Sequence, residues 1–309
     1  MDSKISANEI AEFLNSELFG ENLYLSGIST LSNPKKDTII FSKKSEINIP
    51  NDISCLVLVP DDFVCFDDKP FKISYIKVNN PRLALARVLN HFFVIKPKPG
   101  ISSTAKIAQN AIISNSATLG EGCIIGKNVI IGNNTILNNN VIVHDNCKIG
   151  NSCYIKSGAV IGEDGFGFEF DENKIPVRIP HLGSVSIGDN VEIGVYTVIA
   201  RGTIEDTIIE NNVKIDDKVF IAHNCKIGKN TLVTACAEIS GSVKIGENCW
   251  IAPNSTVINK IEIGDNALIG IGSVVIADIP PNAKYMGLEA LELKKLRKYK
   301  KDTGYGEKF

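Results

Sequence analysis

His223 has the surroundings expected of a general base. It follows an aliphatic residue by two positions in Ile221-Ala222-His223-Asn224, so we expect its side chain to project from the surface of the fold. Gly241 follows His223 by 18 residues, and Asn259 follows Gly241 by another 18. If the structure repeats with this same interval, the three residues stack along one edge. A neutral imidazole beside an exposed backbone N–H suits acyl transfer, because the ring can deprotonate the nucleophile while the N–H stabilises the oxyanion.

Asp216, seven residues before His223, is the predicted partner that orients the ring and favours its protonated form. Other catalytic chemistries find little support. The four histidines lie far apart and form no HxxxxH pair, and neither GxSxG nor GxxxxGK[ST] occurs. We therefore predict direct transfer without a metal, a permanently bound cofactor or a covalent enzyme intermediate.

A six-residue repeat must position these residues. From Ile101 to Ile161 every sixth residue is aliphatic, and the series resumes at Ile187 and runs to Val275 with one slip. Such hexads are typical of a parallel β-helix, in which each supplies one strand and one turn. Three hexads close one triangular coil, and three hexads are also the interval from His223 to Gly241. The predicted fold is mainly β: a left-handed parallel β-helix over residues 101–282.

Two interruptions break the repeat, and loops that leave a rigid scaffold are common places for function. The longer, 162–186, contains Asp164-Gly165-Phe166-Gly167-Phe168. Exposed Phe166 and Phe168 among glycines favour a ligand or partner contact over packing. The shorter interruption lies between Ile199 and Ile209.

The composition is that of a globular protein, with 44% hydrophobic and 22% charged residues and a net charge of −2 over 309 residues. This near-neutral charge gives no reason to expect a nucleic-acid partner. No stretch is apolar enough to span a membrane, and the N-terminus lacks the pattern of a signal peptide, so we expect a cytoplasmic protein. The eight scattered cysteines are predicted to be reduced packing residues.

Two further regions flank the repeat. Residues 1–95 lack the hexads and are predicted to be a small α/β domain for nucleotide or sugar recognition, with a capping box at Ser6–Glu9 and a helix that starts at Pro81. Residues 283–309 are predicted to be a short helical tail. Its basic cluster, which includes Lys294 and Arg297, is either a solvated helix face or an attraction site for acidic acyl carrier protein or the phosphates of coenzyme A.

The ordered motifs of the chain resemble the UDP-3-O-(3-hydroxyacyl)glucosamine N-acyltransferases of lipid A biosynthesis. They are the N-terminal domain, the hexads, the Asp164–Phe168 loop, Arg201-Gly202, Asp206–Ile209, Ile215–Asp217 and Ile221–Asn224. The resemblance implies a homotrimer with sites between subunits that moves a 3-hydroxyacyl chain from acyl carrier protein to the amine of a UDP-glucosamine derivative. It also implies that His223 is the base, Asp216 its partner and Gly241 the oxyanion donor, with Asn224, Phe166 and Phe168 lining the site.

Some positions depart from that family. Phe41 matches its uracil-binding phenylalanine, but Lys44 and Ile47 occupy the other two recognition positions. Asn259 and Lys260 stand where the family has a second histidine. The candidate substrate-binding residues are therefore Phe41, Lys44, Asn259 and Lys260, together with Asn224, Asp164, Phe166 and Phe168.

Other segments resemble acetyl-CoA-dependent hexapeptide transferases of nucleotide-linked amino sugars. These are Trp250–Ser255 and Gly270–Asn282, which make Trp250, Gly270 and Gly272 candidate donor-binding residues, together with Lys294 and Arg297. An acetyltransferase for another UDP- or dTDP-amino sugar therefore stays open, as does a β-helix that binds ligands or partners without catalysis.

Overall fold

The computed structural model describes residues 4–50, 52–64, 72–95, 97–287 and 293–303. The chain divides into two compact units, Met1–Lys96 and Pro97–Phe309. None of the described helices combines the length and the apolar character that a membrane span needs.

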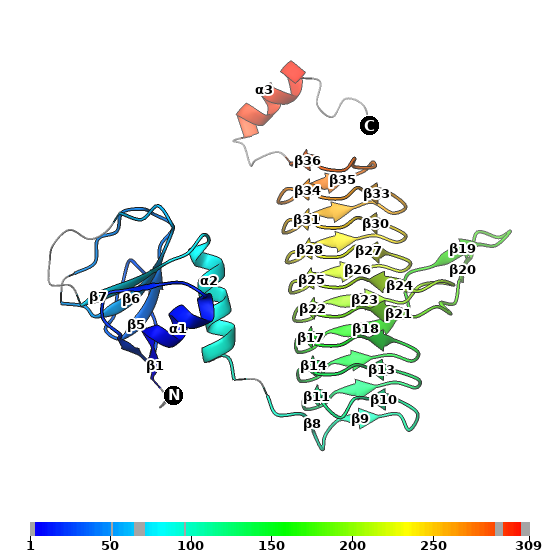
Figure 1. The fold of residues 1–309 in the computed structure, drawn as a ribbon. Helices are drawn as coiled ribbons and strands as arrows, with labels where there is room; N and C mark the ends of the chain where they lie inside the picture. Colours follow the sequence, from blue (N-terminus) through cyan, green and yellow to red (C-terminus); the bar gives the residue numbers. More distant parts are fainter. Residues whose placement is uncertain (1–3, 51, 65–71, 96, 288–292, 304–309) are drawn as a thin grey trace. The chain divides into compact units, whose positions relative to one another are not determined.

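A five-stranded sheet forms the centre of the first unit (Figure 1). β2 is antiparallel to its neighbour and the other strands are parallel. The strands in spatial order are β2 (Leu18–Phe19), β7 (Ile73–Lys77), β6 (Cys55–Val59), β5 (Thr38–Phe41) and β4 (Gly27–Ile28). The helices are α1 (Ala7–Leu14) and α2 (Pro81–Val88), which continues into the π-helical turn η1 (Leu89–Phe93). A separate antiparallel pair consists of β1 (Ile5–Ser6) and β3 (Tyr24–Leu25).

Apolar residues cover both faces of this sheet, because side chains alternate along each strand. Ile39 and Leu56 pack in one cluster with residues of α1 and α2, whereas Ile40 and Val57 belong to a second cluster on the other face. The expected capping box at Ser6–Glu9 is confirmed: the Ser6 N–H donates to Glu9 Oε2 at 2.8 Å, and the Glu9 N–H donates to Ser6 Oγ at 3.2 Å.

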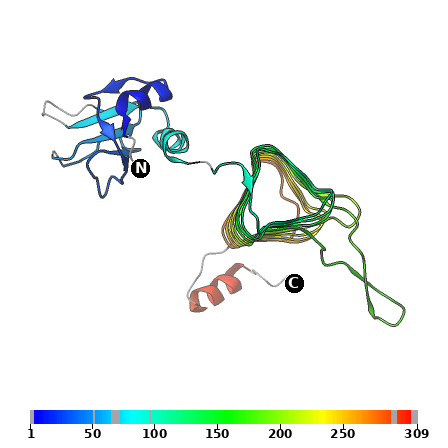
Figure 2. The ribbon, with the colours of Figure 1, turned by 90° about the horizontal axis from the view of Figure 1, so that it is seen from below.

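The second unit is a parallel β-helix with three flat faces and a triangular cross-section (Figure 2). Face 1 consists of β8 (Gly100–Ile101), β11 (Thr118–Leu119), β14 (Ile136–Leu137), β17 (Tyr154–Ile155), β22 (Glu192–Ile193), β25 (Lys214–Ile215), β28 (Leu232–Val233), β31 (Trp250–Ile251), β34 (Leu268–Ile269) and β36 (Lys284–Tyr285). Face 2 consists of β9 (Lys106–Ile107), β12 (Ile124–Ile125), β15 (Ile142–Val143), β18 (Val160–Glu163), β23 (Val198–Ala200), β26 (Phe220–Ile221), β29 (Glu238–Ile239), β32 (Thr256–Val257) and β35 (Val274–Val275). Face 3 consists of β10 (Ile112–Ile113), β13 (Ile130–Ile131), β16 (Lys148–Ile149), β21 (Val185–Ile187), β24 (Thr207–Ile209), β27 (Lys226–Ile227), β30 (Lys244–Ile245) and β33 (Glu262–Ile263).

Outside the interruptions, each coil repeats the previous one after three hexads, as the sequence predicts. Ile112 pairs with Ile130, and Ile130 pairs in turn with Lys148. The aliphatic residue of each hexad points into the prism, so that Ile131 and Ile251 are almost completely buried. Each such side chain stabilises the fold by about 1.5–3 kcal/mol through burial. The aliphatic series is therefore the lining of one continuous core.

The corners need a residue in the left-handed backbone region, which asparagine tolerates better than most side chains. At the corner between face 3 and face 1, Asn212, Asn230 and Asn248 have φ near +60°, and their side-chain amides bond to one another at 3.1 and 3.0 Å. Cys236 occupies a similar corner position with φ 59° and is exposed, which corrects the expectation that it packs in the interior. The six other described cysteines are buried and free, as predicted.

Both interruptions of the repeat leave the prism at one corner, which joins face 2 to face 3 and which we call the loop corner (residues 164–184, 201–206, 222–225, 240–243 and 258–261). The longer interruption contains an antiparallel hairpin of β19 (Phe168–Phe170) and β20 (Pro176–Arg178) that projects from the prism (Figures 1 and 2). The strands on either side still pair in phase, since Ile155 pairs with Ile193 across the excursion.

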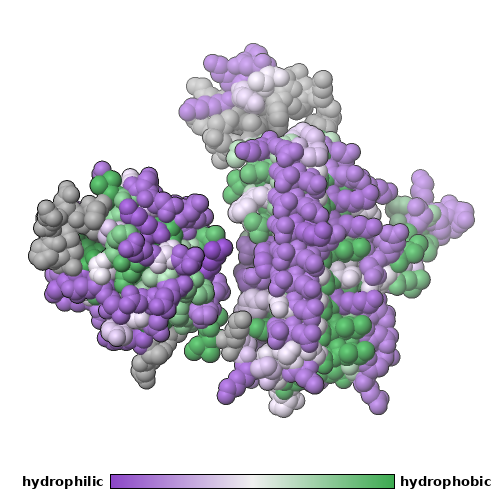
Figure 3. Space-filling model, viewed as in Figure 1, coloured by the Kyte–Doolittle hydropathy of each residue, from purple (hydrophilic) through white to green (hydrophobic). Residues whose placement is uncertain are grey.

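The prism extends past the boundary expected at residue 282. β36 pairs with β34 in parallel, so the backbone of Lys284 and Tyr285 continues face 1 and does not belong to the tail. The tail contributes the helix α3 (Leu293–Thr303), which agrees with the helical tail expected over residues 283–309; residues 288–292 and 304–309 of this tail lie outside the described residues. Hydrophilic side chains run along much of the prism, and apolar ones gather on its lower coils, where Ile112, Ile124 and Ile130 are exposed (Figure 3).

Candidate active site

His223 stands at the loop corner, in the turn that joins β26 to β27. Its ring is half-buried. Gly241 and Asn259 occupy the same place in the next two coils, where the N–H of Ser242 donates to the carbonyl of His223 and the N–H of Lys260 donates to that of Gly241. The three residues therefore stack along one edge, as their spacing of three hexads predicts.

Asn224 holds the ring of His223 in one tautomer. Its Oδ1 lies 2.9 Å from Nδ1 of His223. The same oxygen accepts hydrogen bonds from the N–H and Oγ1 of Thr203, at 3.2 and 3.0 Å. Because a backbone N–H can only donate, this atom of Asn224 is the carbonyl oxygen, and Nδ1 of His223 must carry a proton toward it. In the neutral ring, Nε2 is then the unprotonated atom, as a general base requires.

Gly241 approaches the His223 ring so closely that no side chain fits between them. A Cβ at position 241 would lie 2.7 Å from both Cε1 and Nε2 of His223. In other turns, a side chain of the next coil accepts from the corresponding backbone N–H: Asp145 accepts from Lys127, and Asp265 from Glu247, at 2.7 and 2.8 Å. The N–H of Gly241 has no such partner within the described chain, so it is free to donate to a ligand.

The base of the hairpin packs on the other side of the His223 ring. A Cβ at Gly165 would lie 2.9 Å from Cδ2 of His223 and 2.8 Å from Nε2 of His181. The rings of His181 and His223 meet edge to face with their centroids 5.1 Å apart. Phe166 is 85% exposed, and the centroid of its ring lies 4.8 Å from that of the Phe168 ring. The exposure predicted for these two rings is thus confirmed.

Charged groups fasten the hairpin to the prism. Asp164 accepts from Nη2 of Arg178 at 2.9 Å, and this bond lowers the pKa of the Asp164 carboxyl. Arg201, mostly buried, donates to the carbonyls of Gly162 and Asp145 at 2.6 and 3.1 Å. Asp164 is therefore engaged in the structure of the hairpin.

A pocket of about 410 Å³ opens beside His223 and Gly241. Its walls come from successive coils of the prism and from the hairpin. It is lined by Phe166, Phe220, Ala222, His223, Glu238, Ser240, Gly241, Ser242, Asn259 and Lys260. The sequence-predicted residues Phe166, Asn259 and Lys260 thus meet His223 and Gly241 in one cavity.

Asp216 does not contact His223 within the chain. It lies in the turn from β25 to β26, at the corner between faces 1 and 2, and strand β26 separates it from His223. Their spacing exceeds one hexad, and one hexad of this prism carries the chain from one corner to the next. The prediction that Asp216 orients the ring is therefore wrong for residues of one chain, where Asn224 takes that place.

The predicted donor-binding residues lie away from the loop corner. Trp250 stands on face 1 with 45% of its surface exposed. Gly270 and Gly272 lie at the corner between faces 1 and 2, where Gly272 lines a separate pocket of about 300 Å³ with Val274 and Met286. Lys294 and Arg297 belong to α3, and their side chains lie outside the described part of the chain.

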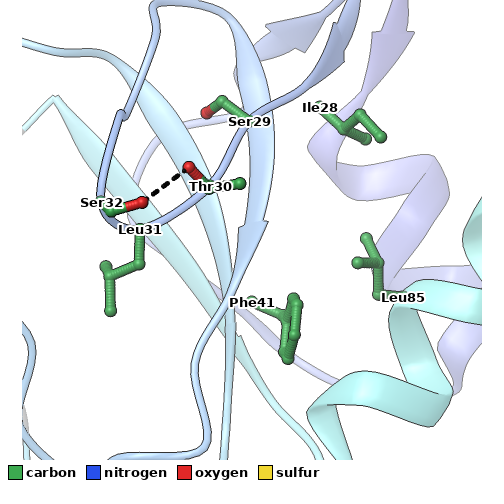
Figure 4. Close-up of a pocket in the computed structure, with 7 residues that line it drawn as sticks. All are labelled: Ile28, Ser29, Thr30, Leu31, Ser32, Phe41 and Leu85. Carbon is green, nitrogen blue, oxygen red and sulfur yellow. Dashed lines mark hydrogen bonds between the residues drawn. The ribbon is translucent and has the colours of Figure 1, made fainter.

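The first unit contains a pocket of its own, of about 780 Å³ and mostly apolar (Figure 4). Phe41 lines it, together with Ile28, Ser29, Thr30, Leu31, Ser32 and Leu85. Lys44 is exposed and does not line this pocket, and Ile47 packs partly against the second core cluster. The structure therefore brings Phe41, but not Lys44, to a cavity.

Two residues of the candidate site were missed by the sequence analysis. His181 is buried against His223 although 42 positions separate them, and Thr203 orients Asn224 from the shorter interruption. The available signal was their position: each lies in a segment that breaks the hexads and so belongs to the corner of His223. Among the described residues, no group of three or more His, Cys, Asp or Glu side chains is arranged to hold a metal ion.

Comparison with known proteins defines the class of this fold and site. Residues 104–139, 128–163, 206–241 and 242–277 match the bacterial transferase hexapeptide repeat. The crystal structure of Francisella novicida UDP-N-acetylglucosamine acyltransferase is similar over 65% of this chain and 73% of that one, with a TM-score of 0.56 and 29% identity. The chain is thus a hexapeptide-repeat protein with the acyltransferase type of left-handed β-helix, as the sequence predicts.

A closer group of relatives gives the family. UDP-3-O-acylglucosamine N-acyltransferase of Ectopseudomonas mendocina is 44% identical over 265 residues, which cover 78% of this chain and 74% of that protein. The chain belongs to the UDP-3-O-acylglucosamine N-acyltransferase family. The relative of the same name from Coxiella burnetii is 56% identical over 88 residues, and this match covers 28% of the chain and 26% of that protein.

Proposed function

We propose that the protein is an N-acyltransferase that moves an acyl group from a thioester to the amine of a UDP-linked glucosamine derivative. The observation that carries the proposal is the arrangement of His223 between Asn224 and Gly241, with His223 and Gly241 lining one pocket. The names of the relatives support the acceptor class, since the family is named for a UDP-3-O-acylglucosamine.

The proposed reaction uses few groups. Nε2 of His223 accepts a proton as the amine nitrogen attacks the thioester carbonyl and the new C–N bond forms. The N–H of Gly241 donates to the oxyanion of the tetrahedral intermediate. The C–S bond then breaks, and the proton held by His223 passes to the departing thiolate. No covalent enzyme intermediate is needed.

The remaining candidates take supporting parts in this proposal. Phe166 and Phe168 cover the acyl chain or sugar, Asn259 and Lys260 bind polar groups of the substrate across the pocket, and the cavity at Phe41 accepts the nucleobase. Asp216 can act on His223 only from a neighbouring subunit. A homotrimer with sites between subunits is therefore part of the proposal. We also propose that the protein acts in the cytoplasm.

The donor is either acyl carrier protein or coenzyme A. Trp250, Gly270, Gly272, Lys294 and Arg297 are the residues proposed for it, and the first three lie away from the loop corner of the same chain. These three can serve the reaction only if a second subunit brings its face 1 to the pocket. Light scattering at micromolar concentration tests this arrangement, because a monomer excludes a site between subunits.

The decisive experiment measures thiol release by the purified protein. Acyl-CoA and acyl-carrier-protein donors of several chain lengths are combined with UDP- and dTDP-linked amino sugars. We expect turnover with a UDP-glucosamine derivative, and replacement of His223 by alanine should lower kcat by about 10²–10⁴-fold. Turnover only with acetyl-CoA and another amino sugar supports the acetyltransferase alternative. No thiol release from any pair supports the non-enzymatic one.

A further inference from the structure

His181 is a buried histidine with an unused acceptor. Only 4% of the residue is exposed. Its Nδ1 lies 3.1 Å from the carbonyl oxygen of Ile179, which can only accept, so Nδ1 carries a proton. Nε2 of the neutral ring is then an acceptor, and it has no hydrogen-bond partner among the described residues. Leaving a buried polar atom unpaired costs about 1–3 kcal/mol, which calls for an explanation.

Gly165 contacts both this acceptor and the His223 ring. The one point at which Gly165 would carry a side chain lies 2.8 Å from Nε2 of His181 and 2.9 Å from Cδ2 of His223. Gly165 thus allows the hairpin to cover both rings at once. Gly167 makes a second close approach, with its Cβ position 2.9 Å from Cε1 of His181. The hairpin therefore fixes the orientation of His181 and excludes water from Nε2.

We propose that His181 is a positioning residue for His223, whose fixed, unprotonated Nε2 favours the imidazolium that forms when His223 accepts the proton of the attacking amine. Nε2 is the negative end of the neutral His181 ring, and a negative dipole end beside a ring stabilises a positive charge on it. This inference rests on the function proposed for His223.

His181 resists protonation because its ring is buried. Burial, followed by the nearby charge of His223, lowers the pKa of His181. The other charged groups that face the two rings are Asp164 and Arg178 on the hairpin, Arg201 beneath it, and Glu238 and Lys260 across the pocket. All five are unchanged when His181 is replaced, so a difference between variants reports on His181.

The test compares His181→Phe, which keeps a ring but removes the acceptor, with His181→Gln, whose amide oxygen can replace Nε2. The full-length protein labelled at histidine Cε1 is titrated by NMR, and the kcat, KM and pH profile of each variant are measured. For His181→Phe we expect the pKa of His223 to fall by roughly half a unit and kcat to fall about threefold at unchanged KM. His181→Gln should restore both. His144→Phe is the matched control, because His144 lies at the same corner but pairs with Glu163.

Hydrogen exchange over residues 163–183 shows whether the hairpin keeps its place in each variant. If the pKa of His223 is the same in wild type and His181→Phe, or if both variants lose protection of the hairpin without a change in this pKa, His181 only packs and the inference is wrong. The NMR titration needs no substrate. It therefore decides the role of His181 even if the wild-type protein releases no thiol and the proposed function fails.

Discussion

The amide oxygen of Asn224 lies 2.9 Å from Nδ1 of His223 and is itself held by Thr203. This one contact fixes which nitrogen of the histidine is available as a base. In the proposed reaction, the shorter interruption of the repeat thus acts without lining the pocket, since it orients the amide that orients the ring.

Loss of the Asn224 side chain should impair turnover more than binding. A hydrogen bond to a charged group contributes about 1.5–3 kcal/mol. Glycine keeps the left-handed backbone at this position, where φ is 60°, so we expect Asn224→Gly to lower kcat about 10–100-fold with little change in the melting temperature. Asn224→Asp keeps an acceptor and should retain most activity. Equal kcat values for wild type and Asn224→Gly would show that another group holds the tautomer.

A single methyl group at position 241 should block catalysis. The backbone of Gly241 is not in the left-handed region, so alanine is unstrained there except for its contact with the His223 ring. We expect Gly241→Ala to displace the ring from the N–H and to lower kcat on the order of 10²-fold. Gly100→Ala is the control, because its Cβ would meet nothing within 4 Å. Steady-state kinetics and thermal melting of both variants check this expectation.

Phe166 should matter for substrate binding and not for folding. Since 85% of this residue is exposed and it lines the pocket, its removal costs little packing but takes apolar surface from a bound substrate. We expect Phe166→Ala to raise KM about tenfold and to leave the melting temperature unchanged. Phe170→Ala, on the same hairpin but outside the pocket, should keep the wild-type KM. Similar KM values for both variants would exclude a substrate contact at Phe166.

His181 should make stability depend on pH in a defined window. Its pKa in the folded protein lies below the ordinary value of 6.5, so the unfolded chain binds more protons between these two values. Stability from this group is complete above pH 6.5 and is lost as pH falls through the folded-state pKa. The melting temperature of wild type should therefore fall more steeply between about pH 7 and pH 5 than that of His181→Phe. Parallel curves would show that His181 is not buried in the neutral form.

The repeat made most of the fold predictable. A strict spacing of aliphatic residues dictates which side chains line the core, and Ile131 and Ile251 are buried as this pattern requires. The same spacing brought His223 and Gly241 into one edge, because every coil between them is regular. The prism ends later than predicted, because Lys284 and Tyr285 still pair with β34 after the two prolines.

The contacts of the hairpin could not be predicted in this way. Its residues have no fixed phase relative to the coils, so neither the burial of His181 nor its contact with His223 follows from spacing. Asp216 shows a different limit. Its short distance from His223 along the chain suggested a contact, but strand β26 lies between the two residues and places them at different corners of the prism. The orientation of Asn224 likewise depends on Thr203, whose segment departs from the repeat.

Because both excursions begin and end at one corner while Ile155 still pairs with Ile193, and Ile193 with Ile215, the prism tolerates a change of length there while the strands of face 1 stay in phase. The coils of the prism are thus the constant part of the structure, and the two excursions are the part that can vary in length. An excursion of other sequence at residues 164–184 that kept a histidine at position 181 would give His223 and Gly241 a new pocket wall on the same prism.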